Sequence, residues 1–339
     1  MKKLQNSLYI TKQGVYVHKA RETIVIEQDK KKLMQIPAHS LMGLYCFGRV
    51  ALSPYLIGFC GETGINLSLF TEYGRFLGRF QGAQTGNVLL RRAQYRTSDA
   101  SPIDIARVVI GAKISNTRKI LLRRLRNHGA QSDIKKVADQ LSICLRQAKN
   151  AETVSVLMGV EGDAAAKYFS VFQHLIRADL MAEFPFTGRN RRPPKDPVNA
   201  MLSFLYSVIG KDISAALQGV GLDPQVGFLH ADRPGRDSLA QDLLEEFRAW
   251  WADRLVLSLI NRKQVRAKDF VVEVSGAVRM NDDTRKVLLT ALQQRKQETV
   301  RHPFLNEDVA VGLLPHVQAL LLARHLRGDL ECYPPFSPK

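Results

Sequence analysis

A carboxylate in the middle of an apolar helical stripe is the first sign of chemistry in this sequence. At about 100° per residue, the helix predicted around Glu161 places Val154, Tyr168 and Phe172 on the same side as that glutamate. A carboxylate buried without a partner destabilises a fold, so it is paired, protonated or bound to a metal ion. Glu161 is therefore either one partner of a structural ion pair with an arginine, or a catalytic carboxylate or metal ligand.

A second acidic pair lies in the segment SLAQDLLEEFR. Asp242 and Glu245 are three residues apart, which places both on one face of a predicted helix, opposite a core-facing stripe that contains Leu239 and Leu243. A solvated acidic face is the ordinary interpretation of an isolated Asp-x-x-Glu pair, and it is the one we adopt for Glu246. The alternative is that Asp242 and Glu245 supply oxygen atoms to a functional site.

His230 lies in a loop, GLDPQVGFLHADRPGRDSL, that glycines and prolines separate from the helices on either side. A histidine in such a loop is often a surface residue. Together with two or three carboxylates from separate helices, however, it forms a mixed nitrogen and oxygen site, which favours Mn²⁺ or Mg²⁺ over zinc or copper. Phosphodiester chemistry requires such an ion to polarise the phosphoryl oxygen. The sequence lacks a Gly-x-x-x-x-Gly-Lys-Ser/Thr motif, which excludes a P-loop NTPase.

The charge of the chain indicates a polyanionic partner. The sequence has 49 Lys and Arg against 32 Asp and Glu, a net charge of +17, which is typical of a protein that binds nucleic acid. Basic clusters such as Arg91-Arg92, Arg123-Arg124 and Arg262-Lys263 follow no base-reading motif, so they predict contacts with phosphate. A basic protein that is merely soluble is the alternative. With 45% hydrophobic and 24% charged residues, the composition excludes a mainly disordered chain.

The hydrophobic period divides the chain into two predicted domains of an α+β protein. Residues 1–86 are expected to form a small antiparallel β domain, and residues 87–339 a larger, mainly α-helical catalytic domain. The predicted strands are 8–10, 15–17, 23–26, 32–37, 41–46, 65–69 and 76–80, with one short helix that begins after Ser53. The predicted helices are 103–127, 132–149, 153–177, 197–209, 238–260, 283–298 and 309–327, with a hairpin at 270–280.

Residues 185–197 interrupt the helical pattern as a proline-rich, basic and exposed loop. It is either a solvated linker or a DNA-contacting loop, and we include Arg191 and Arg192 among the predicted DNA contacts on the basis of charge. No apolar run approaches the roughly 20 residues of a membrane span, and no signal peptide is evident. The four cysteines form no Cys-x-x-Cys pair, so we expect a reduced, cytoplasmic protein without a disulfide framework or zinc ribbon.

Five segments together resemble one family. They are GVEGDAAAKYF (159–169), PVNAMLSFLYSVI (197–209), GLDPQVGFLH (221–230), RDSLAQDLLEEFR (236–248) and QALLLARHLRGDLECYPPF (318–336). The chain resembles, over nearly its whole length, the CRISPR-associated endonuclease of the spacer-acquisition module, the first-numbered Cas protein. The resemblance implies a metal-dependent DNA nuclease and integrase that inserts foreign DNA fragments into a repeat array. Joining both ends of one fragment needs two sites, hence at least a homodimer, and the resemblance further implies a small partner, Cas-two, that bridges two dimers.

The resemblance also assigns residues. It makes Glu161, His230 and Glu245 the metal ligands, and Asp242 a further acidic position near the site. The other assigned positions are Asn199 and Tyr206, which are expected to line the site and contact DNA, and Arg236, which is expected to contact phosphate. A non-catalytic architectural DNA-binding protein and an RNA-processing metallonuclease remain the alternative functions.

These assignments make a geometric prediction. Glu161, His230 and Glu245 come from two predicted helices and a loop, and nothing local in the chain brings them together. As ligands of one ion, their donor atoms have to converge within about 4–5 Å of a common point. We expect Asp242 on the rim of this site, and at least one arginine or lysine close to the carboxylates.

Overall fold

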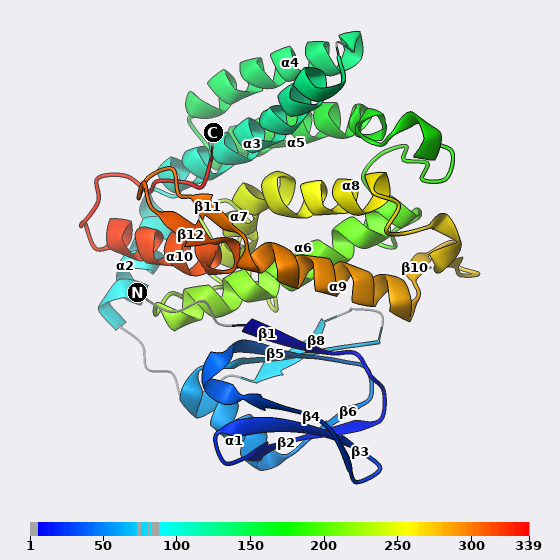
Figure 1. The fold of residues 1–339 in the computed structure, drawn as a ribbon. Coiled ribbons are helices and arrows are strands. Elements are labelled where there is room, and N and C mark those ends of the chain that lie inside the picture. Colours follow the sequence, from blue (N-terminus) through cyan, green and yellow to red (C-terminus); the bar gives the residue numbers. More distant parts are fainter. Residues whose placement is uncertain (1–5, 73–75, 81, 83–87, 130, 339) are drawn as a thin grey trace.

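The computed structural model describes residues 6–72, 76–80, 82, 88–129 and 131–338. Strands occupy the first part of the chain and helices most of the rest, as the period predicted (Figure 1). Strand β8 ends at Phe80 and helix α2 begins at Val88. The predicted boundary between residues 86 and 87 lies outside the described residues.

The N-terminal domain contains two four-stranded sheets. One has the order β1-β5-β7-β8 and the other the order β4-β3-β2-β6. The strands are β1 (Asn6–Ile10), β2 (Val15–Ala20), β3 (Thr23–Gln28), β4 (Lys31–Pro37), β5 (Leu41–Phe47), β6 (Val50–Leu52), β7 (Asn66–Phe70) and β8 (Phe76–Phe80). Buried side chains such as Val17, Ile24, Leu44 and Leu67 share one core.

The expected antiparallel pairing is wrong in detail, because both sheets are mixed. Strand β5 pairs in parallel with β1 and with β7, and β2 pairs in parallel with β6. Parallel neighbours need a crossover connection, and β6 with helix α1 (Pro54–Thr63) forms the one that joins β5 to β7. The helix begins where the sequence predicted it, since Ser53 Oγ accepts the backbone N–H of Leu56, and it ends at Gly64 in the left-handed conformation (φ 71°).

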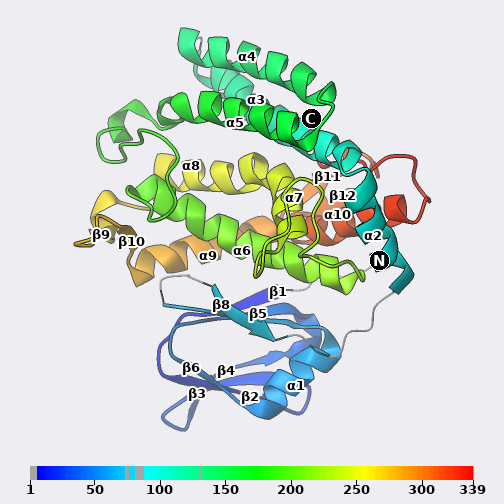
Figure 2. The same cartoon turned by 180° about the vertical axis from the view of Figure 1, so that it is seen from behind.

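The C-terminal domain is a layered helical assembly. Helices α3, α4 and α5 form one outer layer, α7 and α8 lie in the middle, and α6 and α9 lie next to the β domain (Figures 1 and 2). The helices are α2 (Val88–Ala100), α3 (Ile103–His128), α4 (Ser132–Lys149), α5 (Val154–Ser170), α6 (Pro197–Gly219), α7 (Ser238–Phe247), α8 (Arg254–Asn261), α9 (Asp282–Gln297) and α10 (Leu314–Leu326). Two small hairpins pair β9 (Phe270–Val272) with β10 (Val278–Met280), and β11 (Thr299–Arg301) with β12 (Asp308–Ala310).

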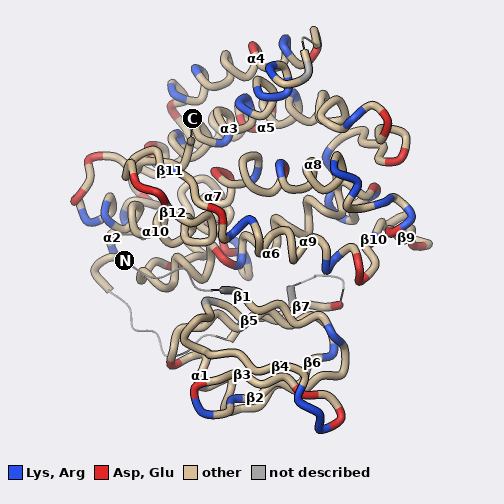
Figure 3. Tube along the Cα trace, in the orientation of Figure 1, with Lys and Arg blue, Asp and Glu red and all other residues tan. Residues whose placement is uncertain are grey.

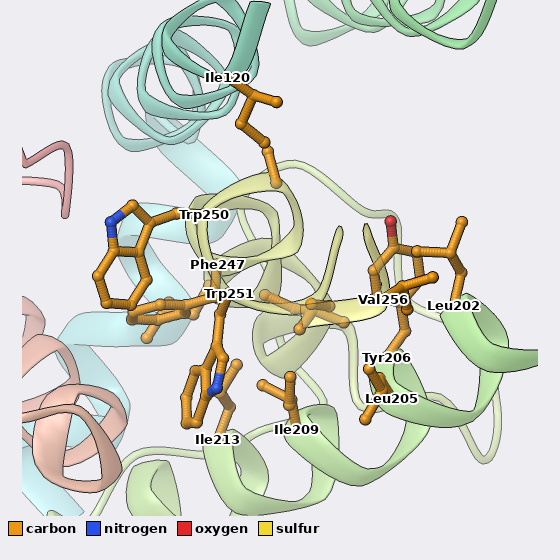
Figure 4. Packing of buried hydrophobic residues seen from close by; sticks show 14 of the residues in the cluster. Ile120, Leu202, Leu205, Tyr206, Ile209, Ile213, Phe247, Trp250, Trp251 and Val256 are labelled. Atoms are coloured by element: carbon orange, nitrogen blue, oxygen red, sulfur yellow. The ribbon is translucent and has the colours of Figure 1, made fainter. Parts of the chain in front are cut away.

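A π-helical segment, Arg248–Asp253, joins α7 to α8 and makes one nearly continuous helix through the centre of this domain. Its two tryptophans lie in the core. Figure 4 shows Trp250 and Trp251 beside Phe247, with Ile209 and Ile213 of α6 on the other side of Trp251. The middle layer, which carries Glu245, is therefore held by packing on several sides.

The end of helix α6 differs from the prediction for an identifiable reason. Helix α6 continues past Ile209 to Gly219 because its polar residues Lys211 and Asp212 find partners, Asp237 and Lys296 respectively. Helix α6 is also long and apolar enough to cross a membrane by length and composition, although the sequence predicted no apolar run of that length. However, 72% of its most apolar window is buried inside the fold, as in the core helix of a soluble protein.

A buried polar cluster connects the two domains. The Lys296 ammonium lies 2.5 Å from Asp212 Oδ2 and donates to the Tyr9 hydroxyl at 3.1 Å, and the Tyr45 hydroxyl donates to the same aspartate. Burial opposes the charged form of Lys296, but Asp212 outweighs it and keeps the pKa of this lysine above its ordinary value. The β domain is thus fixed to α6 and α9 by charge as well as by apolar packing.

Candidate active site

Two of the predicted site residues converge on a lysine that the sequence analysis did not select. Lys113 of α3 forms an ion pair with Glu161 of α5, and its Nζ lies 2.6 Å from Glu245 Oε2 of α7. Three helices that are distant in sequence therefore meet at one ammonium group. Burial opposes the charge of Lys113, but Glu245 and Glu161 raise its pKa above the ordinary value.

Glu161 is less buried than its position in the apolar stripe predicted. Its side chain is 24% exposed, so the site opens toward solvent on the α5 side. Its partner is a lysine rather than the arginine of the structural alternative. The Glu161 carboxylate is thus partly accessible, and its ion pair with Lys113 differs from a bidentate structural pair with arginine.

Glu245 is the buried member of the pair. Its side chain is 6% exposed, and Oε1 lies 3.1 Å from the Arg248 guanidinium, one turn further along the helix. Burial alone raises the pKa of a carboxyl group, but Arg248 and Lys113 lower the pKa of Glu245 to about 2. The Glu245 carboxylate is therefore ionised at neutral pH.

Asp242 orients His230 instead of lying on the rim of the site. It is 1% exposed, and Oδ1 lies 2.6 Å from His230 Nδ1. The same carboxylate accepts the backbone N–H groups of Phe228 at 2.7 Å, Leu229 at 3.0 Å and His230 at 3.1 Å. The prediction that Asp242 lies on the rim of the site is wrong, because almost every residue of α7 is buried. Asp242 and Glu245 therefore contact different neighbours although they are only three residues apart. Within the described residues, Nδ1 is the only His230 ring nitrogen with a partner, which leaves Nε2 for a ligand.

Helix α2, which the sequence analysis missed, holds the His230 loop from the other side. The buried Gln94 side chain donates to the carbonyls of Asp223 and Val226, both at 2.8 Å, and Ser98 Oγ donates to the Gly227 carbonyl at 2.6 Å. Gly227 packs so tightly that an added Cβ would lie 2.8 Å from Asp242 Oδ2. A glutamine and a serine four residues apart, as at 94 and 98, are a weak sequence signal. Their role in holding the His230 loop is evident only once α2 is packed against that loop.

We expect Asp242→Asn to weaken the site without removing a ligand. The amide cannot accept the three backbone N–H groups and the imidazole N–H as the carboxylate does, so His230 loses its fixed orientation. Loss of a partner of this kind costs about 10–100-fold in metal affinity or activity. Titration with Mn²⁺ and a DNA-joining assay measure the two effects. An unchanged Mn²⁺ affinity together with unchanged activity would contradict this role for Asp242.

The residue types at this site are those that bind a divalent ion, but their positions in the structure are not those of a metal site. Among the residues that the structure describes, no group of three His, Cys, Asp or Glu side chains is close enough to hold a metal ion. The predicted convergence of Glu161, His230 and Glu245 is therefore not met, since Lys113 lies between the two glutamates. The lysine nevertheless shows that these carboxylates share one cation, because the buried Oε2 of Glu245 faces the Lys113 ammonium at 2.6 Å. Two carboxylates and an imidazole fit Mg²⁺ or Mn²⁺.

Asn199 and Tyr206 were expected to line the site and contact DNA, and the structure gives them other roles. Asn199 is fully buried and fastens the basic loop to α6, where it accepts from Arg189 and donates to the Gly188 carbonyl. The Tyr206 hydroxyl donates to Asp253 at 2.5 Å, and its ring lies 4.6 Å from the Arg248 guanidinium. Neither side chain has a surface that DNA can reach. Tyr206 supports Arg248, which in turn pairs with Glu245.

The predicted phosphate contacts lie in two different environments. Arg191 and Arg192 are exposed in an irregular segment, as predicted for the loop 185–197. Arg236 bends back onto its own loop, where Nη2 donates to the Ala231 carbonyl and Nε to Ser238 Oγ at 3.1 Å. Within the described residues, Arg236 therefore stabilises the loop that carries His230. Contact of any of these arginines with phosphate remains a prediction.

Comparison with known proteins assigns the chain to a family. The sequence model for the CRISPR-associated protein Cas1 family matches residues 8–294, which include Lys113, Glu161, His230, Asp242 and Glu245. A protein named CRISPR-associated endonuclease Cas1 1, from Chlorobaculum tepidum, is 51% identical over 341 residues and covers 99% of both chains. The chain belongs to the Cas1 family.

Solved structures agree with the Cas1 assignment. A Cas1 protein from Thermotoga maritima is 26% identical, has a TM-score of 0.82, and covers 96% of this chain and 97% of its own. A casposase bound to its integration product has the same fold, with 22% identity, a TM-score of 0.82, and coverage of 96% and 92%. The predictions of the family, of a strand-rich domain before a helical one and of an endonuclease are confirmed.

Proposed function

We propose that this Cas1 protein is a DNA integrase and nuclease that needs Mg²⁺ or Mn²⁺ and joins foreign DNA fragments to a CRISPR repeat array. The observation that carries the proposal is the sharing of one cation by Glu161 and Glu245, in a family of endonucleases. Glu161, Glu245 and the Nε2 atom of His230 would hold the metal ion. When bound, such an ion polarises a phosphoryl oxygen and offsets the charge that develops in the transition state.

The residues around the carboxylates prepare the site for a phosphodiester. Arg248 and Lys113 keep Glu245 ionised, and either cation is positioned to meet a phosphate oxygen once the lysine leaves the carboxylates. The 3′-hydroxyl of the incoming fragment attacks the phosphorus, a new P–O bond forms, and the 3′-oxygen of the cut strand leaves. The number of phosphodiester bonds is unchanged, so no nucleotide fuel is needed. Water as the nucleophile produces a nick.

The joining of two fragment ends requires two such sites. We therefore propose that the protein acts as a homodimer in the cytoplasm, together with Cas-two, as the resemblance implies. The solved casposase with the same fold is bound to an integration product. That structure supports strand joining, rather than cutting alone, as the reaction of this site.

Binding to random duplex DNA is expected to fall steeply with salt. Figure 3 marks the lysines and arginines of the helices in blue, and exposed ones such as Arg92, Arg126 and Lys135 are expected to neutralise phosphates. The logarithm of the binding constant then falls by about 0.9 per phosphate for each tenfold rise in salt. Fluorescence anisotropy over a range of salt concentrations gives the slope. A slope near zero would show that electrostatic contacts do not carry the binding.

One assay separates this function from its alternatives. The protein is incubated with labelled DNA or RNA, with Mn²⁺ or with a chelator, and joined and cut products are resolved on a gel. Mn²⁺-dependent joining of DNA supports the proposal. Binding without any reaction favours an architectural protein, and cutting of RNA alone favours an RNA-processing nuclease.

A further inference from the structure

A cavity of about 610 Å³ lies between α3, α8 and α9, and none of the candidate site residues lines it. Its apolar surface includes Ile120, Trp251 and Leu255, and Figure 4 shows Ile120 of α3 above the tryptophans of the central helix. Arginines make up most of its charged surface. They are Arg123, Arg124, Arg254, Arg262 and Arg295.

The arginines of this cavity lack matching negative charge. Glu298 is the one acidic lining residue, and it pairs with Arg295. Within the described part of the chain, Arg123, Arg254 and Arg262 have no carboxylate partner, and the Arg254 guanidinium lies over the Trp250 ring at 5.8 Å. Burial lowers the pKa of Arg254, and the charges of Arg123 and Arg295 lower it further, to about 10. Cations this crowded are stabilised by an anion that binds between them.

The cavity is connected to the candidate active site by two helices. On α3, Arg123 follows Lys113 by 10 residues, and on the central helix Arg254 follows Glu245 by 9 residues. At 1.5 Å per residue, the 10 residues of α3 place the cavity about 15 Å further along, and the central helix accompanies α3 over this stretch, because α3 contacts both α7 and the π-helical segment. With a rise of 3.4 Å per nucleotide, this distance corresponds to about four base pairs of duplex DNA.

We propose that this cavity is a second DNA-binding site, which holds the sugar–phosphate backbone about four base pairs from the phosphodiester that reacts. The inference rests on the proposed function for the identity of the ligand. Guanidinium groups bind phosphate oxygens in a bidentate manner, and the apolar part of the wall fits the sugar. Contact at a fixed distance from the site holds the strand in register for the reaction.

The first test compares paired arginine variants in a chelator, so that no reaction takes place. Arg123→Gln with Arg254→Gln is expected to reduce the slope of log K against log salt by about two, because each lost phosphate contact contributes about 0.9. Arg126→Gln is the matched control, since Arg126 is exposed on the same helix but does not line the cavity. When Arg254→Lys replaces Arg254→Gln in this pair, the charge at position 254 is retained, and part of the lost slope should return. Thermal unfolding confirms that each variant is folded.

The second test locates the contact. A neutral methylphosphonate is placed at single positions of a duplex that contains the integration site. At about four base pairs from the reacting phosphodiester, it should weaken binding of the wild type but not of the Arg123/Arg254 variant. Equal slopes for the cavity variant and Arg126→Gln, or equal loss at that position in both proteins, would overturn the proposal. An absence of joining by the wild type would count against the proposed function alone, because the binding measurements use no metal ion.

Discussion

Glu161→Ala is expected to lower strand joining by at least about a hundredfold, the upper range for loss of a residue that supports a metal site, while duplex binding in a chelator stays unchanged or becomes slightly tighter. The reason is that the two functions depend on different charges. Glu161 shares a cation with Glu245 at the candidate active site, whereas we expect affinity for DNA to come from exposed basic residues elsewhere, such as Arg92 and Arg126. Removal of a negative charge does not weaken attraction to phosphate.

A control on the same helix separates chemistry from stability. Asp163 is exposed on α5 and pairs with Lys167 one turn away, so Asp163→Ala removes a carboxylate from the helix without touching the site. We expect this variant to join DNA at the rate of the wild type. If Glu161→Ala joins DNA normally, Glu161 has no role in catalysis. If it unfolds at temperatures where Asp163→Ala is stable, its role is structural.

The sequence was sufficient to select Glu161 and Glu245, which the structure brings to one cation, but not the lysine that they share. Glu161 stood out because a carboxylate in an apolar stripe needs an explanation, and His230 because of its punctuated loop. Lys113 did not stand out, because a lysine in a basic helix resembles any solvated residue until α3 packs against α5 and α7. Long-range packing is set by the whole core, and no local spacing reports it.

Glu246 is a second residue whose environment the sequence did not predict. We assigned it to a solvated acidic face, but it is fully buried and accepts the Tyr333 hydroxyl, the Gln318 amide and the Phe336 backbone N–H, each at 2.7–2.9 Å. Burial raises its pKa to about 7. The C-terminal segment that the resemblance relied on is therefore anchored next to Glu245. Asp242, Glu245 and Glu246 lie within five consecutive residues of one helix and yet have three different roles, because tertiary contacts and not helical spacing determine their partners.

The second prediction concerns the lysine itself. Lys113→Met is expected to destabilise the metal-free protein by about 3–5 kcal/mol, since it leaves two carboxylates facing each other without the ammonium between them. Mn²⁺ should then restore the loss, because an ion that binds only the folded state adds to its stability in proportion to the logarithm of its concentration over Kd. In the wild type the same ion has to displace Lys113, so the stabilisation by Mn²⁺ should be smaller.

Thermal unfolding in chelator and at increasing Mn²⁺ concentrations measures both effects without any reaction. Lys119→Met is the matched control, because it removes an ammonium from the same helix that donates to the Pro338 carbonyl and to Ser337 Oγ rather than to a carboxylate. Its response to Mn²⁺ should equal that of the wild type.

In a Lys113→Met, Glu161→Gln double variant, one of the two carboxylate charges that face each other is removed. Its metal-free form should be more stable than Lys113→Met, and its response to Mn²⁺ should be largely lost. Equal stabilisation of wild type, Lys113→Met and the double variant by Mn²⁺ would mean that the ion binds elsewhere, and the cation shared by Glu161 and Glu245 would then be the lysine alone.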